Sequence, residues 1–167
     1  PADPPHAGIV AKRHMVAVAD PYAADAALSM LRAGGTAVDA AIAAQMVLNL
    51  VEPQSSGIGG GAFLLYGTAN GKLTGYDGRE VAPKSATPGM FLGADGKPQR
   101  LRDAIPGGLS IGVPGALAML AKAHAEHGKL PWAKLFEPAI NLASGGFKVP
   151  PRLGAEINGF LKNTDMP

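Results

Sequence analysis

The pattern of apolar and polar positions predicts a strand and a helix at the start of the chain. A short apolar run at residues 15–19 has the length and composition of a β-strand. Asp20 follows the run and can cap a helix in which Pro21 takes the first position. Apolar residues then recur at helical spacing until Gly34 and Gly35, which are typical of a helix end. We therefore expect a strand followed by a first helix.

A second helix is predicted from Thr36 to about Val51. Thr36 and Asp39 stand three residues apart, as in a capping box, with Asp in the place of the usual Glu. Pro53 ends the pattern. The helix is rich in alanine, which lets a neighbouring element approach its axis closely, so we expect it to be largely buried. The alanines are Ala40, Ala41, Ala43 and Ala44.

A β-hairpin is predicted in the centre of residues 55–83, and the rest of the chain is interpreted as organised around it. A glycine-dense turn leads into an apolar segment at residues 62–68, and a second strand-like segment follows at 72–77. Asn70-Gly71 stands between them, and Asn-Gly suits a two-residue turn in which both central positions have positive φ. The sequence thus predicts two antiparallel strands joined by a tight turn.

The second half of the chain is predicted to be a long loop followed by helices. Residues 83–112 have loop-like sequence, with an exposed turn at 93–98. A helix is expected from Pro114-Gly115 to just before Gly128. Two shorter helices follow, separated by Pro138, and a last helix runs from Pro150-Pro151 towards Leu161. Helices therefore dominate, and the predicted fold class is α+β with a central hairpin.

Composition excludes several classes of protein. A chain of 167 residues with 47% hydrophobic content can build one domain with a core, and its longest apolar-rich stretch, residues 38–51, is too short and too interrupted to span a bilayer. The net charge is +2, from 15 basic and 13 acidic residues that are scattered along the chain, so nucleic acid is not a predicted partner. Cysteine is absent, which excludes disulfides and cysteine-ligated metals. No cofactor is predicted.

The first 14 residues are interpreted as a flexible leader, and residues 15–167 as the folded part. The polar, proline-rich start resembles what remains after a signal peptide has been removed, or an engineered boundary. The first of these readings predicts a periplasmic or secreted protein.

Arg79 is the candidate binding residue, because it directly follows the second predicted strand, where a stiff element can hold its position. Its guanidinium offers a planar fork of donors that matches a carboxylate. The alternative interpretation is an ordinary surface arginine paired with Glu80 or Asp77. The residues alone leave both interpretations open.

Two other motifs match known signatures in the wrong context. Residues 57–62 fit the G-x-G-x-x-G/A dinucleotide pattern, but a helix is predicted before them and a strand after them, the reverse of what pyrophosphate binding requires. Residues 108–112 fit G-x-S-x-G around Ser110. No buried strand precedes that serine, and the last downstream histidine, His127, lies in the next predicted helix, so no hydrolase triad can be completed in the required order.

Two histidines stand three residues apart on the predicted helix that ends before Gly128. His124 and His127 have a spacing that can bind a metal when further ligands join, but the sequence nominates no third ligand. Solvated histidines near a helix C-terminus are the simpler interpretation. No metal site is predicted.

Four motifs, taken together, resemble the large subunit of the gamma-glutamyltranspeptidases. They are G-G-T-A-V-D-A-A at 34–41, G-G-G-A-F at 59–63, D-G-R-E-V-A-P at 77–83 and G-V-P-G at 112–115, in the order of the family. The similarity extends from residue 15 over nearly all of the chain. It implies the N-terminal part of a large subunit, within the αββα sandwich of an N-terminal nucleophile (Ntn) hydrolase whose two subunits arise by self-cleavage of one precursor.

The resemblance implies that Arg79 holds the α-carboxylate of a γ-glutamyl substrate. The family's nucleophile is a threonine at the start of the small subunit, which would be the partner of this chain. None of the threonines here stands in such a motif, so no catalytic residue is expected in this chain; they are Thr36, Thr68, Thr74, Thr87 and Thr164. Many relatives carry an aromatic residue or alanine where Gly78 stands. The alternatives are therefore a cephalosporin or glutaryl acylase of the same family, and a catalytically silent fragment or binding module.

Overall fold

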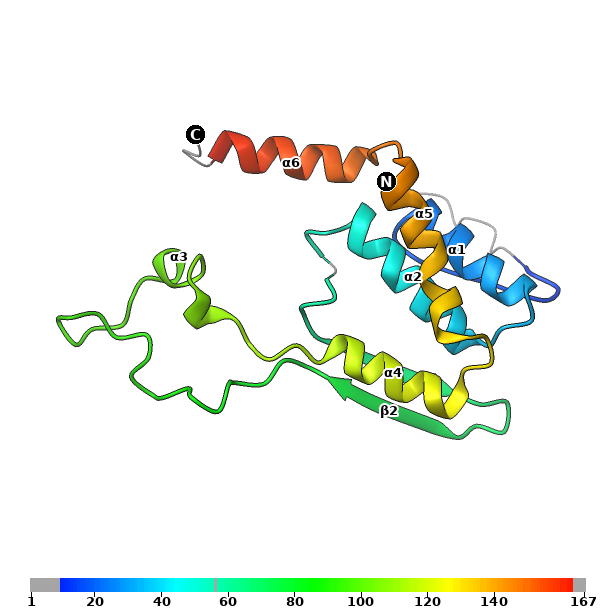
Figure 1. Ribbon diagram of the computed structural model, residues 1–167, viewed down its shortest axis with the longest axis horizontal. Helices are drawn as coiled ribbons and strands as arrows, with labels where there is room; N and C mark the ends of the chain where they lie inside the picture. The colour runs from blue at the N-terminus through cyan, green and yellow to red at the C-terminus, as the bar shows by residue number, and fades with distance from the viewer. Residues whose placement is uncertain (1–9, 56, 164–167) are drawn as a thin grey trace, which may run out of the picture. The chain divides into compact units, whose positions relative to one another are not determined.

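The structure, a computed structural model, describes residues 10–55 and 57–163 (Figure 1). Most of the predicted leader, including His6, and Thr164 lie outside the described residues. The chain divides into two compact units, one formed by the residues up to Pro53 and from His127 onward, the other by Gln54–Glu126. The elements are α1 (Pro21–Arg32), α2 (Ala37–Val51), β1 (Ala62–Gly67), β2 (Leu73–Gly78), α3 (Leu101–Ala104), η1 (Gly108–Ser110), α4 (Ala116–His127), η2 (Trp132–Phe136), α5 (Glu137–Gly145) and α6 (Pro151–Asn163).

Helix α1 begins and ends at the residues that the sequence predicts. The Asp20 carboxylate accepts a hydrogen bond from the backbone N–H of Tyr22 at 2.8 Å, which satisfies one of the unpaired donors of the first turn. At the other end Gly34 has φ 84°, a conformation that costs glycine little, and Gly35 N–H donates to the Met30 carbonyl. The chain then turns directly into α2.

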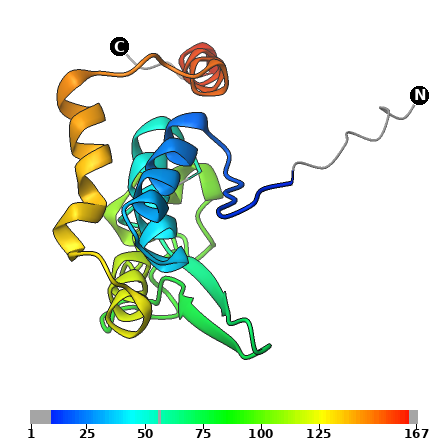
Figure 2. The same cartoon turned by 90° about the vertical axis from the view of Figure 1, so that its right-hand side faces the viewer.

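Helix α2 forms the core of the first unit together with α1, and the two helices lie side by side in both views (Figure 2). Its predicted capping box is confirmed: Asp39 N–H donates to the Thr36 hydroxyl, and the Asp39 carboxylate accepts from Thr36 N–H at 2.7 Å. Apolar side chains on both helices are buried, including Ile42, Ala43, Val47 and Val51 on α2. The predicted burial of the alanine-rich helix is therefore confirmed.

The Asp39 carboxylate also joins this helix start to a distant part of the chain. Besides its bond to Thr36, it accepts hydrogen bonds from the backbone N–H groups of Lys129 at 3.1 Å and Leu130 at 3.3 Å. Asp39 is 0% exposed. A buried carboxylate is tolerated when several donors satisfy it, so Asp39 links the α1–α2 turn to the segment that follows α4.

The strand predicted at residues 15–19 is wrong. Exposure does alternate along it, with Val16 and Val18 half-buried and Met15 and Ala17 exposed, as in an extended chain. Within the described residues, however, no strand pairs with this segment. The apolar run specified extended backbone, but a β-strand also needs a hydrogen-bonding partner, which the local sequence does not supply.

The predicted hairpin is confirmed, while its two-residue turn is wrong. Strands β1 and β2 pair antiparallel, with Ala62 opposite Gly78 and Gly67 opposite Leu73. A longer loop closes them, because Gly71 alone takes positive φ, 84°, while the Asn70 side chain accepts hydrogen bonds from Lys72 N–H and the Thr68 hydroxyl. A type I′ turn would need positive φ at Asn70 as well, and these side-chain bonds favour the wider loop instead.

Helix α4, predicted from Pro114-Gly115, packs against one face of the hairpin. A methyl group built on Gly78 would lie 2.7 Å from the Met119 Cβ, so the helix approaches the end of β2 too closely for a larger residue. Tyr76, on the same face of β2, donates its hydroxyl to the Glu126 carboxylate at 2.6 Å. Gly78 therefore faces the helix.

The long segment after β2 holds short elements that the sequence did not predict. Helices α3 and η1 span four and three residues and are held by local backbone bonds, so they leave no apolar periodicity to detect. The expected turn at 93–98 is present: Gly93 N–H donates to the Lys97 carbonyl at 2.8 Å, and Gly96 has φ 73°. Leu92 and Pro98 form an isolated bridge beside it.

The C-terminal helices agree with the sequence. Pro138 stands in the first turn of α5, Gly146 follows its last residue with φ 80°, and α6 begins at Pro151. The Arg152 guanidinium lies 3.4 Å from the Glu52 carboxylate, beside the end of α2. None of the helices in the described part of the chain is long and apolar enough to cross a membrane.

The hydrogen bond between Tyr76 and Glu126 predicts that the Tyr76 hydroxyl loses its proton at a higher pH than an ordinary tyrosine. The hydrogen bond to Glu126, with desolvation, raises the pKa of Tyr76 to about 12. Because the folded-state pKa is raised above that of an unfolded tyrosine, this contribution to stability is complete below pH 10 and is lost between about pH 10 and 12. Absorbance at 295 nm should show a phenolate step near pH 12 that Tyr76→Phe removes and Glu126→Gln moves to lower pH. An unchanged titration in both variants would contradict the assignment.

Candidate functional site

Arg79 lies at the end of the hairpin, on the first residue after β2. Its backbone N–H donates to the Asp77 carboxylate at 2.9 Å, which fixes the direction in which the chain leaves the strand. Its side chain is 70% exposed, so most of the guanidinium is open to a ligand. Arg79 thus occupies the strand-end position that the sequence predicts.

The segment around Arg79 is held by two neighbouring stretches of chain. Val81 and Val113 form an antiparallel bridge through both backbone N–H groups, at 2.9 and 3.3 Å. The Gly60 carbonyl accepts from the N–H groups of Gly115 and Ala116, at the start of α4. Three of the four motifs quoted above, at 59–63, 77–83 and 112–115, therefore meet at one place.

Glu80 lies inside this junction and forms an ion pair with Arg79. Its Oε2 atom is 3.4 Å from the Arg79 Nε, and its side chain is 33% exposed. Both interpretations of Arg79 thus find support, since the guanidinium is exposed and has a carboxylate neighbour. From the sequence alone, Glu80 is predicted only as a surface partner of Arg79. Gly61 and Gly112, which lie against Glu80, were the signal in the sequence that could have indicated its burial. Their contact with Glu80 joins separate segments of the chain and cannot be derived from the sequence.

A cleft of about 340 Å³ begins at the Arg79–Glu80 pair. The guanidinium can present its remaining N–H groups there to a carboxylate, while the apolar wall can contact an aliphatic chain. Apolar and small residues from the segment after β2 form that wall: Val81, Ala82, Pro83, Ala86, Met90, Phe91, Leu109, Ile111 and Gly112.

The structure gives the other sequence motifs ordinary roles. The Ser110 hydroxyl donates to the carbonyls of Ile105 and Gly107, at 2.8 and 2.9 Å, and so closes the turn around η1. The glycine turn at 57–61 leads into strand β1, so no helix N-terminus follows it. Within residues 10–55 and 57–163, no three or more side chains of the metal-binding types, His124 and His127 included, gather into a cation site.

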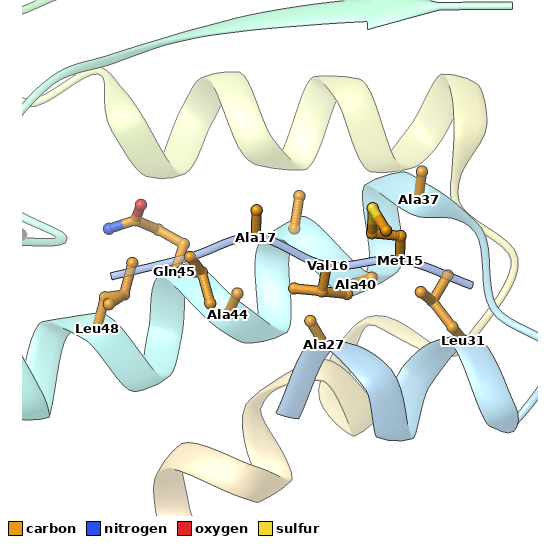
Figure 3. A pocket seen from close by; sticks show the side chains of 12 residues that line it. Met15, Val16, Ala17, Ala27, Leu31, Ala37, Ala40, Ala44, Gln45 and Leu48 are labelled. Atoms are coloured by element: carbon orange, nitrogen blue, oxygen red, sulfur yellow. The ribbon is translucent and has the colours of Figure 1, made fainter. Parts of the chain in front are cut away.

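A second cavity, of about 400 Å³, lies in the other unit between residues 15–18 and helices α1 and α2 (Figure 3). Met15, Leu31 and Leu48 are among the side chains that line it, and Gln45 is its polar member. No charged side chain belongs to this lining. For a charged small molecule, the cleft at Arg79 is therefore the better candidate.

Comparison with known proteins gives consistent matches. The model of the family described as gamma-glutamyltranspeptidase matches residues 23–165. The chain is 46% identical to glutathione hydrolase 2 of Arabidopsis thaliana over 150 residues, which are 90% of this chain and 25% of the relative. It is 45% identical to the glutathione hydrolase proenzyme of Pseudomonas aeruginosa over 136 residues, 80% of this chain and 24% of the relative. The chain thus spans about a quarter of these curated relatives.

Solved structures agree. The gamma-glutamyltranspeptidase of Helicobacter pylori superposes with a TM-score of 0.85 at 32% identity, over 95% of this chain and 46% of that one. The cephalosporin acylase of Bacillus halodurans superposes with a TM-score of 0.69 at 33% identity, over 98% of this chain and 32% of that one. The α+β fold expected from the sequence is therefore confirmed.

Proposed function

This chain belongs to the gamma-glutamyltranspeptidase family and is part of an Ntn-hydrolase fold, and we propose that it binds the donor in γ-glutamyl acyl transfer or hydrolysis. The observation that carries the proposal is Arg79, an exposed arginine that directly follows a strand and helps to line a cleft of about 340 Å³. Glutathione and related γ-glutamyl compounds are the proposed donors. Each has an α-carboxylate that this guanidinium can bind through paired hydrogen bonds.

The proposed chemistry needs a second polypeptide. A threonine at the start of a small subunit from the same precursor would attack the γ-amide carbonyl, with its own α-amine taking the hydroxyl proton. The amide C–N bond would then break, the amine would leave with that proton, and an acyl-enzyme ester would remain. Backbone donors of that subunit would stabilise the oxyanion, and water or an amino acid would release the acyl group. Arg79 would fix the donor by its carboxylate so that the amide carbon meets the nucleophile. This chain would then supply binding.

A second candidate is an acylase that acts on glutaryl-type amides. The likeness to the cephalosporin acylase of Bacillus halodurans supports it. A glutaryl group has the same terminal carboxylate as a γ-glutamyl group but no α-ammonium, so Arg79 would serve both donors. The two functions are distinguished by comparing kcat/KM for the γ-glutamyl and glutaryl p-nitroanilides.

The first experiment is intact mass spectrometry of the purified full-length protein under denaturing conditions, followed by assay with γ-glutamyl p-nitroanilide. We expect two polypeptides, one of them beginning with threonine, and release of nitroaniline. A single uncleaved polypeptide without activity towards either anilide would contradict the proposed enzymatic function and would favour a binding module. We also propose that the protein acts in the periplasm or outside the cell, which fractionation of the source cells would test.

A further inference from the structure

The burial of the Glu80 carboxylate, where the segments around Gly60, Arg79 and Val113 meet, is not explained by an ordinary surface ion pair with Arg79. Glu80 follows Arg79 directly, yet its Oε2 atom is buried, whereas the guanidinium beside it is largely exposed. Within the described residues no hydrogen-bond donor reaches that oxygen, but it forms an ion pair with the Arg79 Nε at 3.4 Å. A buried carboxylate oxygen is costly unless it interacts with a charge, so its pairing with Arg79 matters more than an exposed pair would.

Two glycines form the notch that holds Glu80. A methyl group on Gly61 would lie 2.8 Å from the carboxyl carbon of Glu80, and one on Gly112 would lie 3.0 Å from its Cβ. Distances below about 3.0 Å require something to move, so the carboxylate fits only because Gly61 has no side chain. The bridge between Val81 and Val113 fixes the backbone directly after Glu80. The notch therefore restricts where Glu80 can place its charge.

We propose that Glu80 is the positioning residue for Arg79: seated against Gly61 and Gly112, it holds the guanidinium through Nε, so that the other N–H groups point at the donor carboxylate. An arginine side chain has several freely rotating bonds, and a fixed partner removes much of the entropy cost of orienting it. Arg79 then stands between two carboxylates, one from the protein and one from the ligand. The inference rests on the proposed function.

The test measures binding of two ligands by the full-length two-chain enzyme and three variants. The ligands are γ-glutamyl p-nitroanilide, through KM and kcat, and glutaramic acid, through its competitive inhibition constant; the second keeps the carboxylate and the γ-amide but lacks the ammonium. Glu80→Gln keeps the size of the side chain and removes the charge. Gly61→Ala fills the notch, and Gly59→Ala is its matched control, because a methyl group there meets nothing within 4 Å.

We expect Glu80→Gln and Gly61→Ala to raise both KM and the inhibition constant by about tenfold, because a guanidinium that is no longer held in place would lose about one charge-assisted hydrogen bond to the donor carboxylate. The kcat should stay within about twofold, whereas general damage to the fold would lower it together with the yield of cleaved enzyme. Gly59→Ala should match the wild type. If Gly61→Ala does not mature, Glu80→Gln decides alone.

Other results would overturn the inference. Unchanged constants in Glu80→Gln, with a raised KM in Arg79→Ala, would remove the role of Glu80 and leave the proposed function intact. A raised KM with an unchanged inhibition constant for glutaramic acid would mean that Glu80 binds the donor's ammonium instead. No effect in Arg79→Ala itself would reject the proposed function and the inference together.

Discussion

Arg79→Ala should raise the KM for γ-glutamyl p-nitroanilide by about a hundredfold and change kcat much less. A carboxylate bound by a guanidinium gains two charge-assisted hydrogen bonds, and losing them costs roughly 1.5–3 kcal/mol each before compensation by water. Because 1.4 kcal/mol corresponds to a factor of about ten, the loss in affinity reaches about two orders of magnitude. Arg79→Lys should fall between, since an ammonium keeps the charge but not the planar fork. Steady-state kinetics of the full-length enzyme measure both.

Arg100→Ala is the matched control for this experiment. Arg100 is 67% exposed, against 70% for Arg79, and its guanidinium also pairs with a neighbouring carboxylate, Asp103 at 2.6 Å. It is not among the residues that line the cleft, so its replacement should leave KM within about twofold of the wild type. Equal kinetic effects of the two alanine variants would mean that Arg79 acts as an ordinary surface charge.

Asp39→Ala should lower the free energy of unfolding of the helical unit, which is the unit formed by the residues up to Pro53 and from His127 onward, by about 3–5 kcal/mol. The substitution removes the acceptor of the part-buried N–H groups of Thr36, Lys129 and Leu130, which surround a carboxylate that is 0% exposed. Each buried unsatisfied donor costs roughly 1–3 kcal/mol, and the helix also loses half of its capping box. Hydrogen exchange of the α1 and α2 amides reports the loss locally, so an intact second unit does not mask it.

Asp25→Ala provides the comparison for Asp39, because Asp25 is an exposed aspartate on α1. It should change the protection of the same amides by no more than about 0.5 kcal/mol. Asp39→Asn keeps the volume but replaces one accepting oxygen with a donor, and should lie between the two alanine variants. Protection in Asp39→Ala that equals that of Asp25→Ala would show that water satisfies the three backbone groups.

The sequence correctly predicted the helix ends whose hydrogen bonds join residues close together in the chain. The Asp20 cap, the Thr36–Asp39 capping box and the α4 start after Gly115 could all be identified, because each depends on residues within one helical turn. Arg79 could be placed at a strand end for the same reason. The family resemblance supplied its proposed ligand, which neither spacing nor composition could give.

Contacts between distant residues could not be predicted. That Asp39 also binds Lys129 and Leu130 depends on packing across ninety residues of chain, and the notch of Gly61 and Gly112 around Glu80 depends on a junction of three segments. The apolar run at 15–19 correctly indicated an extended backbone. The predicted β-strand was wrong, because no strand in the described residues pairs with this segment. Alternation along a sequence says nothing about which partner is present.

During ribosomal synthesis, Asp39 is made long before Lys129 and Leu130, whose backbone N–H groups donate hydrogen bonds to its carboxylate. The helical unit is discontinuous, because the contiguous residues Gln54–Glu126 are inserted between its two parts. A nascent chain that has emerged only as far as the hairpin already contains α1 and α2, but lacks the Lys129 and Leu130 donors. Since domains fold as units during synthesis, the inserted unit can fold first, while α1 and α2 wait with an incompletely satisfied carboxylate. Translation pausing just before residue 129 would therefore prolong the stage at which the Asp39 carboxylate lacks these two donors.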